Sequence, residues 1–251
     1  MIHHSGMILA AGYGERLRPE TDGIPKPLFK IGSTNMIRNA IAYLVRHGVT
    51  EVAINLFHLG RMIKGDLSKN PPKGAKLFFV EEKVLMGTGG GIKGAERFLG
   101  GSDIVVINSD VLTDLDLAGA IDFHRSKNAL ATLVTRKNPN PEKIGSLAEG
   151  EGGRLVRFLG SKSPAYDVEN ENVPLMFTGI HVLSRDFLKK IPAGRPVNVS
   201  TEVYAPLVAA GEPVYVFNHE GYWADIGTPE SYRAAQEDVK SGRFVPYGET
   251  R

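Results

Sequence analysis

The feature that most constrains the fold is an alternation of short apolar runs with longer helical patterns through the first half of the chain. The apolar runs have the length of strands and lie at residues 7–10, 51–55, 76–80 and 104–108. The helical patterns between them lie near residues 35–47, 60–67 and 91–99. Such alternation is typical of βαβ units with parallel strands. It predicts an α/β protein whose ligands bind at the carboxyl ends of the strands.

The first apolar run leads into a loop of small residues that two cations follow. Gly12 and Gly14 allow a phosphate to approach the backbone, and Arg16 and Lys26 come after them, with a proline on either side of the lysine. The loop amides can form an anion-binding concavity, the guanidinium is a forked phosphate donor and the ammonium is a compact point charge. This layout predicts a cradle for a triphosphate.

Two common glycine-loop motifs do not fit this segment. A dinucleotide fingerprint needs a third glycine that opens a helix, but Leu17 stands at that position and several prolines follow. A P-loop needs Gly-Lys followed by Ser or Thr, which neither Gly12 nor Gly14 provides. A surface loop with solvated charges is the remaining alternative.

Composition limits the other classes of function. The formal net charge of +2 is too small to indicate nucleic-acid binding by itself, and nothing suggests a membrane span. The absence of cysteine excludes disulfides and thiolate metal sites. With no secretory signal, the expectation is a cytoplasmic protein that binds neither nucleic acid nor membrane.

Two carboxylates follow apolar strand patterns. Asp110 comes just after the run 104–108, and Asp225 ends the run 222–225. Proteins hold Mg²⁺ with one or two carboxylates and leave its other positions to water and substrate phosphate. The alternative for Asp110 is a turn residue, and for Asp225 a cap before the next helix, although Thr228 already supplies an N-cap there.

A second glycine-rich segment, residues 87–92, follows Glu82 and leads into a helix. Small residues there would let a flat base lie against the backbone, and Glu82 would accept a ring N–H. Guanine and uracil both offer such an N–H, so the base stays open. The alternative is a helix entry that needs glycine for close packing.

Together these motifs resemble those of the sugar-1-phosphate nucleotidyltransferases, also called nucleotide-sugar pyrophosphorylases. The matching segments occur in the family's order and cover nearly the whole chain: residues 9–28, 87–92, 108–110, 177–180 and 221–230. The resemblance implies a Rossmann-like, GT-A-type fold, in which a mostly parallel central sheet is flanked by helices and carries a smaller sugar-binding lobe. The chain is expected to be a short form without the C-terminal hexapeptide-repeat domain of some relatives.

The chain is expected to form one domain, residues 1–251, with a soft internal boundary near residue 137. Residues 1–136 would be the nucleotide-binding half, and residues 137–251 would supply the sugar-binding lobe and a closing strand and helix. The run 155–158 and the run 175–183 are the strand patterns of this second half.

The activity implied by the resemblance is transfer of a nucleotidyl group from a nucleoside triphosphate to a sugar 1-phosphate. The products would be a nucleotide sugar for cell-envelope polysaccharide and pyrophosphate, Mg²⁺ would be the cofactor, and a homo-oligomer is compatible with it. The attacking phosphate is already ionised, so no general base is needed. Alignment and charge neutralisation dominate such transfers.

The resemblance assigns site residues by their match to the family's motifs. The expected catalytic residues are Arg16, Lys26, Asp110 and Asp225, and Asp110 and Asp225 would hold the metal. The expected nucleotide-binding residues are Leu9, Ala10, Ala11, Gly12, Gly14, Glu82, Gly87 and Thr88. The expected sugar-binding residues are Gly145, Thr178 and Glu202, although Glu202 also suits the first turn of a helix that Ser200 would cap.

The sequence departs from the family's pattern at three places. Ser109 stands where relatives usually have glycine, and Thr178 stands in place of the middle residue of Asn-Ala-Gly. No Glu-Lys-Pro follows the strand at 155–158, so Lys162 has either a phosphate-binding role or that of a solvated loop lysine.

Three other functions are alternatives to this activity. A glycosyltransferase of related fold commonly has Asp-x-Asp after this strand, but Val111 and Leu112 follow Asp110. A regulatory protein that binds nucleotide sugars without turnover has no need of the full set of charges. A cytidylyltransferase for a non-sugar phosphate such as phosphocholine would favour a pocket of several aromatic residues.

Overall fold

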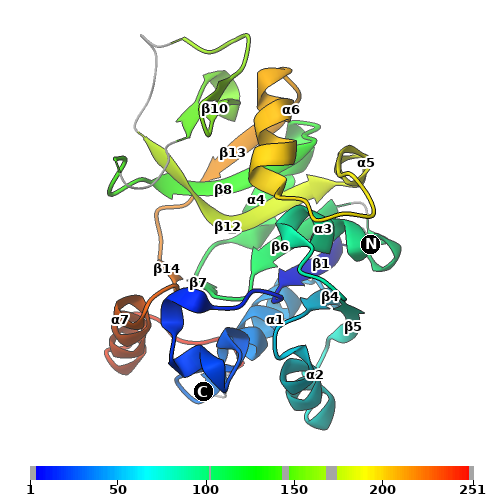
Figure 1. Cartoon of the computed structure of the whole chain (residues 1–251). Helices are drawn as coiled ribbons and strands as arrows, with labels where there is room; N and C mark the ends of the chain where they lie inside the picture. The colour runs from blue at the N-terminus through cyan, green and yellow to red at the C-terminus, as the bar shows by residue number, and fades with distance from the viewer. Residues whose placement is uncertain (1–3, 102, 143–146, 168–173, 249–251) are drawn as a thin grey trace.

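The computed structural model describes residues 4–101, 103–142, 147–167 and 174–248 (Figure 1). Its centre is a seven-stranded sheet with the strand order β13-β8-β12-β6-β1-β4-β5. These strands are β1 (His4–Leu9), β4 (Glu51–Leu56), β5 (Lys76–Glu81), β6 (Asp103–Asn108), β8 (Ala131–Lys137), β12 (Leu175–Ser184) and β13 (Val214–Asn218). β12 runs antiparallel to β6 and β8, and the other neighbours are parallel, which confirms a mostly parallel sheet.

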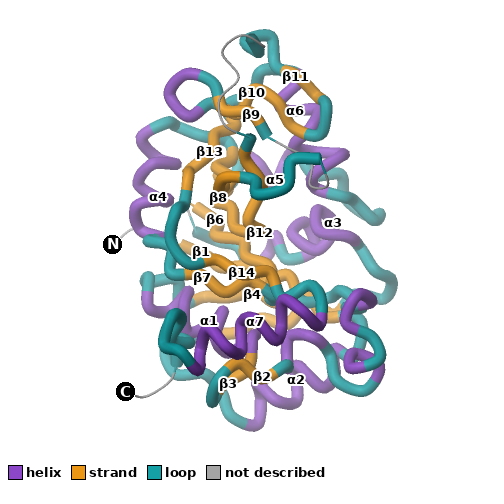
Figure 2. The backbone as a smooth tube through the Cα atoms, turned by 90° about the vertical axis from the view of Figure 1, so that its left-hand side faces the viewer, coloured by secondary structure: helices purple, strands orange, loops and turns teal. Residues whose placement is uncertain are grey.

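Helices cover both faces of this sheet. One face carries α1 (Met36–Arg46), α2 (Gly60–Lys69) and α4 (Leu117–Ser126). The other carries α3 (Gly87–Gly94), α5 (Phe187–Lys190) and α6 (Ala205–Ala209). Figure 2 shows α4 and α3 on opposite sides of the strands. Successive side chains of a strand point to opposite faces, so neighbours such as Met7 and Ile8 enter different core clusters, and the strands read as continuous apolar runs.

Three small sheets complete the fold. β7 (Val111–Thr113) pairs with β14 (Trp223–Asp225), and β2 (Lys30–Ile31) pairs with β3 (Thr34–Asn35). The third contains β9 (Ala148–Glu149), β10 (Leu155–Phe158) and β11 (Ser161–Lys162), and lies beside α6 at one end of the molecule (Figure 1).

The closing helix α7 (Pro229–Lys240) begins with the cap expected from the sequence. The hydroxyl of Thr228 accepts a hydrogen bond from the backbone N–H of Ser231, and the side chain of Ser231 accepts one from the N–H of Thr228. The short helical turns are η1 (Glu15–Leu17), η2 (Glu20–Asp22), η3 (Lys26–Leu28), η4 (Glu96–Phe98), η5 (Glu151–Gly153) and η6 (Ser200–Tyr204). Within the described ranges, no helix is long and apolar enough to cross a bilayer.

The predicted boundary near residue 137 divides the chain but not the sheet. β12 belongs to the second half by sequence, yet it lies between β6 and β8 of the first half. The carboxyl ends of β1, β4 and β6 point to one edge of the sheet, where the candidate site lies.

Candidate active site

A cavity of about 290 Å³ opens at the carboxyl ends of β1, β4 and β6. Its lining residues are Leu9, Ala10, Ala11, Gly12, Gly14, Lys26, Pro27, Asn55, Leu85, Gly87, Thr88, Asn108, Ser109 and Asp110. All the predicted nucleotide-binding residues are among them except Glu82. The two glycine-rich segments, separated by about 70 residues of chain, therefore face one cavity.

The first loop requires glycine at position 14, whereas at position 12 the absence of a side chain leaves the cavity uncovered. Gly14 has a φ of +67°, and a Cβ added there would lie 2.9 Å from a methyl carbon of Thr21. The hydroxyl of Thr21 donates a hydrogen bond to the carbonyl of Gly14 at 3.0 Å, which fixes this turn. A Cβ at Gly12 would meet no atom within 4 Å, so Gly12 leaves the cavity side of the loop uncovered.

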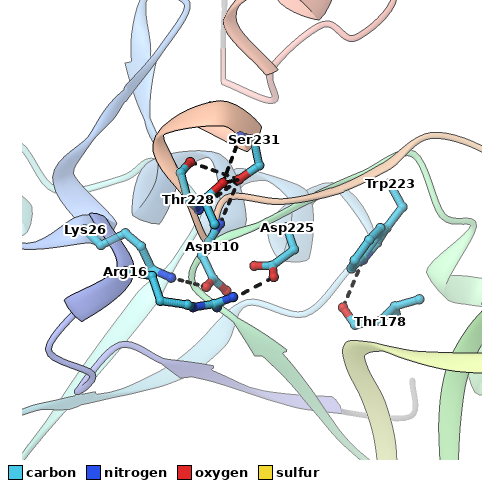
Figure 3. A network of polar contacts seen from close by, with 9 residues as sticks. Arg16, Lys26, Asp110, Thr178, Trp223, Asp225, Thr228 and Ser231 are labelled. Carbon is cyan, nitrogen blue, oxygen red and sulfur yellow. Dashed lines mark hydrogen bonds and ion pairs between the residues drawn. The ribbon is translucent and has the colours of Figure 1, made fainter. Parts of the chain in front are cut away.

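Lys26 and Asp110 meet at the cavity wall (Figure 3). Lys26 opens η3 directly after Pro25, and Asp110 follows β6. The ammonium of Lys26 donates to Oδ2 of Asp110, and the two side chains are only 15% and 14% exposed. Among the described residues that line the cavity, Lys26 is the only cation.

Asp225 reaches the same place from the end of the chain. β14 pairs antiparallel with β7 and sets Asp225 opposite Val111, beside Asp110. Burial and the negative charge of Asp110 raise the pKa of Asp225 to about 6, although Lys26 and Arg16 act in the opposite direction. Its side chain is still 38% exposed, so an ion in the solvent can reach the carboxylate.

Arg16 lies on the outer side of this cluster. Its Nη2 atom is 3.9 Å from Oδ2 of Asp225, and the guanidinium lies over Gly227, where an added Cβ would come within 2.8 Å of it. The arginine is largely exposed and does not line the cavity. Figure 3 shows Arg16 and Lys26 approaching the two carboxylates from one side.

The paired carboxylates fit a divalent cation of the magnesium type. The Asp110 carboxylate destabilises the ionised form of Asp225, and a cation bound to both side chains would relieve that repulsion. Within the described part of the chain, no group of three or more His, Asp or Glu side chains is arranged to hold a metal. Asp110 and Asp225 would then be the protein ligands, with water and phosphate oxygens as the others.

The second glycine-rich segment both lines the cavity and packs closely. The backbone N–H groups of Gly89 and Gly90 donate to the carbonyl of Val197 at 2.9 and 3.3 Å. A Cβ at Gly87, whose φ is +70°, would lie 2.6 Å from the same carbonyl oxygen. The glycines of this segment therefore both allow close packing and line the cavity.

Glu82 faces the protein rather than the cavity. Oε1 of Glu82 accepts a hydrogen bond from Nδ2 of Asn55 at 2.7 Å, and Oε2 accepts one from the backbone N–H of Met86 at 2.9 Å. Glu82 does not line the cavity. In this structure both Glu82 oxygens thus accept from protein groups, whereas the sequence predicted that Glu82 accepts from a ring N–H of the base.

The Thr178 side chain, which was expected to contact the sugar, has a protein partner in this structure. Thr178 is 2% exposed, and its hydroxyl donates to the carbonyl of Val134 at 2.8 Å. Its own carbonyl accepts a hydrogen bond from Nε1 of Trp223 at 2.9 Å (Figure 3). The hydroxyl satisfies the backbone inside the sheet and is not presented to a sugar.

Glu202 also has protein partners. It lies 2.6 Å from Nη1 of Arg195 and accepts a hydrogen bond from the N–H of Asn198 at 2.8 Å. That backbone bond and the nearby arginine lower the pKa of Glu202. The side chain that caps this turn is Asn198 rather than Ser200. Oδ1 of Asn198 accepts hydrogen bonds from the backbone N–H groups of Ser200 and Thr201.

The remaining predicted residues are placed as follows. Gly145 lies outside the described residues. Lys162 belongs to β11 of the three-stranded sheet, and its ammonium lies 4.5 Å from the centroid of the Tyr166 ring. Ser109 is buried and lines the cavity, and its N–H donates to the carbonyl of Leu9 at 3.1 Å.

Asn55 and Asn108 also line the cavity, although neither is among the predicted site residues. Each stands at or next to the carboxyl end of an apolar strand, the same signal that pointed to Asp110. An uncharged amide points to no particular chemistry as a carboxylate does, so position alone does not mark an asparagine as a site residue.

Residues 5–242 match the family model described as nucleotidyl transferase, and the chain belongs to this family. Its relatives include the mannose-1-phosphate guanylyltransferase of Mycobacterium tuberculosis, 31% identical over 238 residues, which are 94% of this chain and 64% of that protein. The mannose-1-phosphate guanyltransferase of Yarrowia lipolytica is 34% identical over 231 residues, with coverages of 90% and 61%. The chain thus spans less than two thirds of the length of these relatives.

Solved structures agree with the fold. HddC from Yersinia pseudotuberculosis has a TM-score of 0.77 and 25% sequence identity, and the match covers 94% of this chain and 99% of that one. A UDP-glucose pyrophosphorylase complexed with UDP-glucose shares the fold at a TM-score of 0.77 and 20% identity, over 97% of this chain and all of that one. The family and GT-A-like fold expected from the motifs are confirmed.

Proposed function

We propose that the protein transfers a nucleotidyl group from a nucleoside triphosphate to a sugar 1-phosphate and releases pyrophosphate. The observation that carries this proposal is the convergence of Lys26, Asp110 and Asp225 at a cavity lined by both glycine-rich loops. The names of the guanylyl- and uridylyltransferase relatives support the same reaction class.

The residues of this chain would act mainly by positioning and charge. The loop amides and Arg16 would hold the β- and γ-phosphates, and Lys26 would move from Asp110 to the phosphates between which the new bond forms. This lowers the repulsion between two polyanions and aligns the attacking oxygen with the α-phosphorus. A bound Mg²⁺ would supply Lewis-acid polarisation of the α-phosphate. The leaving group is pyrophosphate, so no protonation by an acid side chain is required.

We further propose Mg²⁺ as the ion, with Asp110 and Asp225 as its ligands, in a cytoplasmic enzyme that supplies cell-envelope polysaccharide synthesis. The chemistry of a two-carboxylate site supports the choice of ion. GTP and UTP are the first nucleotides to test, because the relatives are named for guanylyl and uridylyl transfer.

A pyrophosphate-release screen tests the proposal. The purified protein and Mg²⁺ would be combined with each common nucleoside triphosphate and a panel of sugar 1-phosphates, with phosphocholine as a non-sugar acceptor. We expect one nucleotide and a small set of sugars to give turnover. Release with phosphocholine alone would favour a cytidylyltransferase of another class, and no release with any pair would contradict catalysis.

A further inference from the structure

A chain of hydrogen bonds connects the two loops that line the cavity. The backbone N–H of Ala10, in the first loop, donates to Oδ1 of Asn55 at 2.9 Å. Nδ2 of Asn55 donates to Oε1 of Glu82 at 2.7 Å, and Oε2 of Glu82 accepts from the N–H of Met86 at 2.9 Å. Met86 immediately precedes Gly87 and the second loop. These hydrogen bonds connect the end of β1 with the end of β5 through the side chains of Asn55 and Glu82.

Each donor in this series of hydrogen bonds faces an acceptor, and the orientations of the Asn55 and Glu82 side chains are therefore fixed. The amide of Asn55 must turn its oxygen to Ala10 and its nitrogen to Glu82, because an N–H cannot accept. Asn55 is 3% exposed, so loss of a partner there would leave a buried polar group unsatisfied.

The glycine-rich helix packs directly on this pair. A Cβ added to Gly91 would lie 2.6 Å from Nδ2 of Asn55 and 3.2 Å from Oε1 of Glu82. On the other side, the carbonyl of Met86 accepts from the N–H of Val197 at 2.8 Å. The start of the second loop is thus held from both sides.

We propose that Asn55 and Glu82 are positioning residues that set the spacing between the phosphate-binding and base-binding loops. This inference rests on the proposed function. Both carboxylate oxygens of Glu82 are used by protein donors, so the pair supports nucleotide binding whichever base is bound. A Glu82 that read the base directly would instead contribute to the preference among bases.

A charge-conserving swap separates these two roles. In Glu82→Gln alone, the new amide nitrogen faces the N–H of Met86 or the amide nitrogen of Asn55, and one donor loses its acceptor. In Asn55→Asp alone, two carboxylates face each other. In the double variant Asn55→Asp/Glu82→Gln, the glutamine nitrogen donates to the aspartate, and the oxygens still accept from Ala10 and Met86. The swap restores every hydrogen bond and the net charge but leaves no carboxylate at position 82.

The experiment measures the dissociation constant of each nucleoside triphosphate by calorimetry, KM and kcat on the active pair, and the thermal unfolding midpoint. We expect each single variant to weaken binding of all nucleotides alike, by roughly 10- to 100-fold, with kcat much less affected. The swap should return affinity to within about threefold of wild type and restore the midpoint. Glu81→Gln, which removes the exposed neighbour paired with Lys64, is the control and should behave as wild type.

The proposal is overturned if the swap binds as poorly as Glu82→Gln, or if either single variant changes the ratio of affinities between bases. If a single variant does not fold, comparing the swap with Glu81→Gln still separates the two roles of Glu82. Only a positioning role tolerates loss of the carboxylate at position 82. Absence of turnover by the wild type would contradict the proposed function, whereas the affinities and midpoints would still support or overturn the positioning role.

Discussion

At the scale of single residues, Asp225 is a carboxylate whose ionised form the surrounding protein destabilises. Burial and the Asp110 carboxylate raise its pKa to about 6, so the folded protein holds a proton that the unfolded chain releases near pH 4. Between these two values the folded state binds more protons, and stability falls as pH rises. Above pH 6 the folded state bears the full cost of the ionised Asp225 carboxylate, and below pH 4 that cost is absent.

Asp225→Asn should therefore raise the thermal unfolding midpoint at pH 7.5 in the presence of a chelator, and the gain should shrink as the pH falls toward 4. The control is Asp186→Asn, because Asp186 is exposed and its hydrogen bond with Lys189 lowers its pKa. That control should give no gain at any pH. An Asp225→Asn midpoint at or below that of wild type at pH 7.5 would contradict this account.

Residue identity predicted which side chains lie close together better than it predicted the partner of each side chain. Charge, position and the family resemblance together point to Lys26, Asp110 and Asp225, and the structure brings these side chains together. Thr178 and Glu82 lie near the expected places, but their polar atoms bond to protein groups. Which partner a side chain takes depends on packing from distant segments, and the sequence pattern around one residue does not contain that information.

At the scale of elements, the start of α3 is restricted to glycine while its end is not. Gly87 has a φ of +70° and lies against the carbonyl of Val197, where a Cβ would come within 2.6 Å. At Gly94 a Cβ would meet Val80 at an ordinary 3.6 Å. The two positions belong to one helix and differ mainly in backbone conformation and space.

Gly87→Ala should lower the free energy of unfolding by about 2 kcal/mol, from left-handed strain and the contact with Val197, and should weaken nucleotide binding. Gly94→Ala is the matched control and should be neutral or stabilising by up to about 1 kcal/mol, since alanine favours the helix. Denaturant unfolding of both variants measures the difference. Equal effects would show that Val197 does not restrict the loop.

Element positions and the mostly parallel direction of the strands were predictable, but the direction and place of β12 were not. Helices at 36–46 and 229–240 and the strands around 51–56 and 155–158 lie where apolar spacing and caps indicated. Apolar periodicity depends only on residues that are close together along the chain, so it can be read from the sequence. The antiparallel insertion of β12 between β6 and β8 is a pairing between distant segments, which no local pattern specifies.

At the scale of the whole molecule, both halves of the chain contribute strands to one sheet. Because β12 separates β6 from β8, the first half alone would lack the strand that joins its own elements. The core clusters likewise combine residues of both halves, such as Met7 with Leu183.

We therefore expect one cooperative unfolding transition. Far-ultraviolet circular dichroism and the fluorescence of Trp223, the single tryptophan, should give coincident denaturant curves. A fragment of residues 1–136 should not fold cooperatively. Two separated transitions in the full chain would contradict a single domain and would instead support an independent sugar-binding lobe.

The most direct measurement of the central claim is the single-turnover rate of pyrophosphate release by Lys26→Ala on the active substrate pair. Lys26 is the only cation among the described lining residues of the cavity, whereas the exposed Lys30 nearby does not line it and provides the control variant, Lys30→Ala. The account predicts a rate loss of about 100- to 1,000-fold for Lys26→Ala with cooperative unfolding retained, and a near-normal rate for Lys30→Ala. A near-normal rate for folded Lys26→Ala would contradict a site in which the reacting phosphates meet at this lysine.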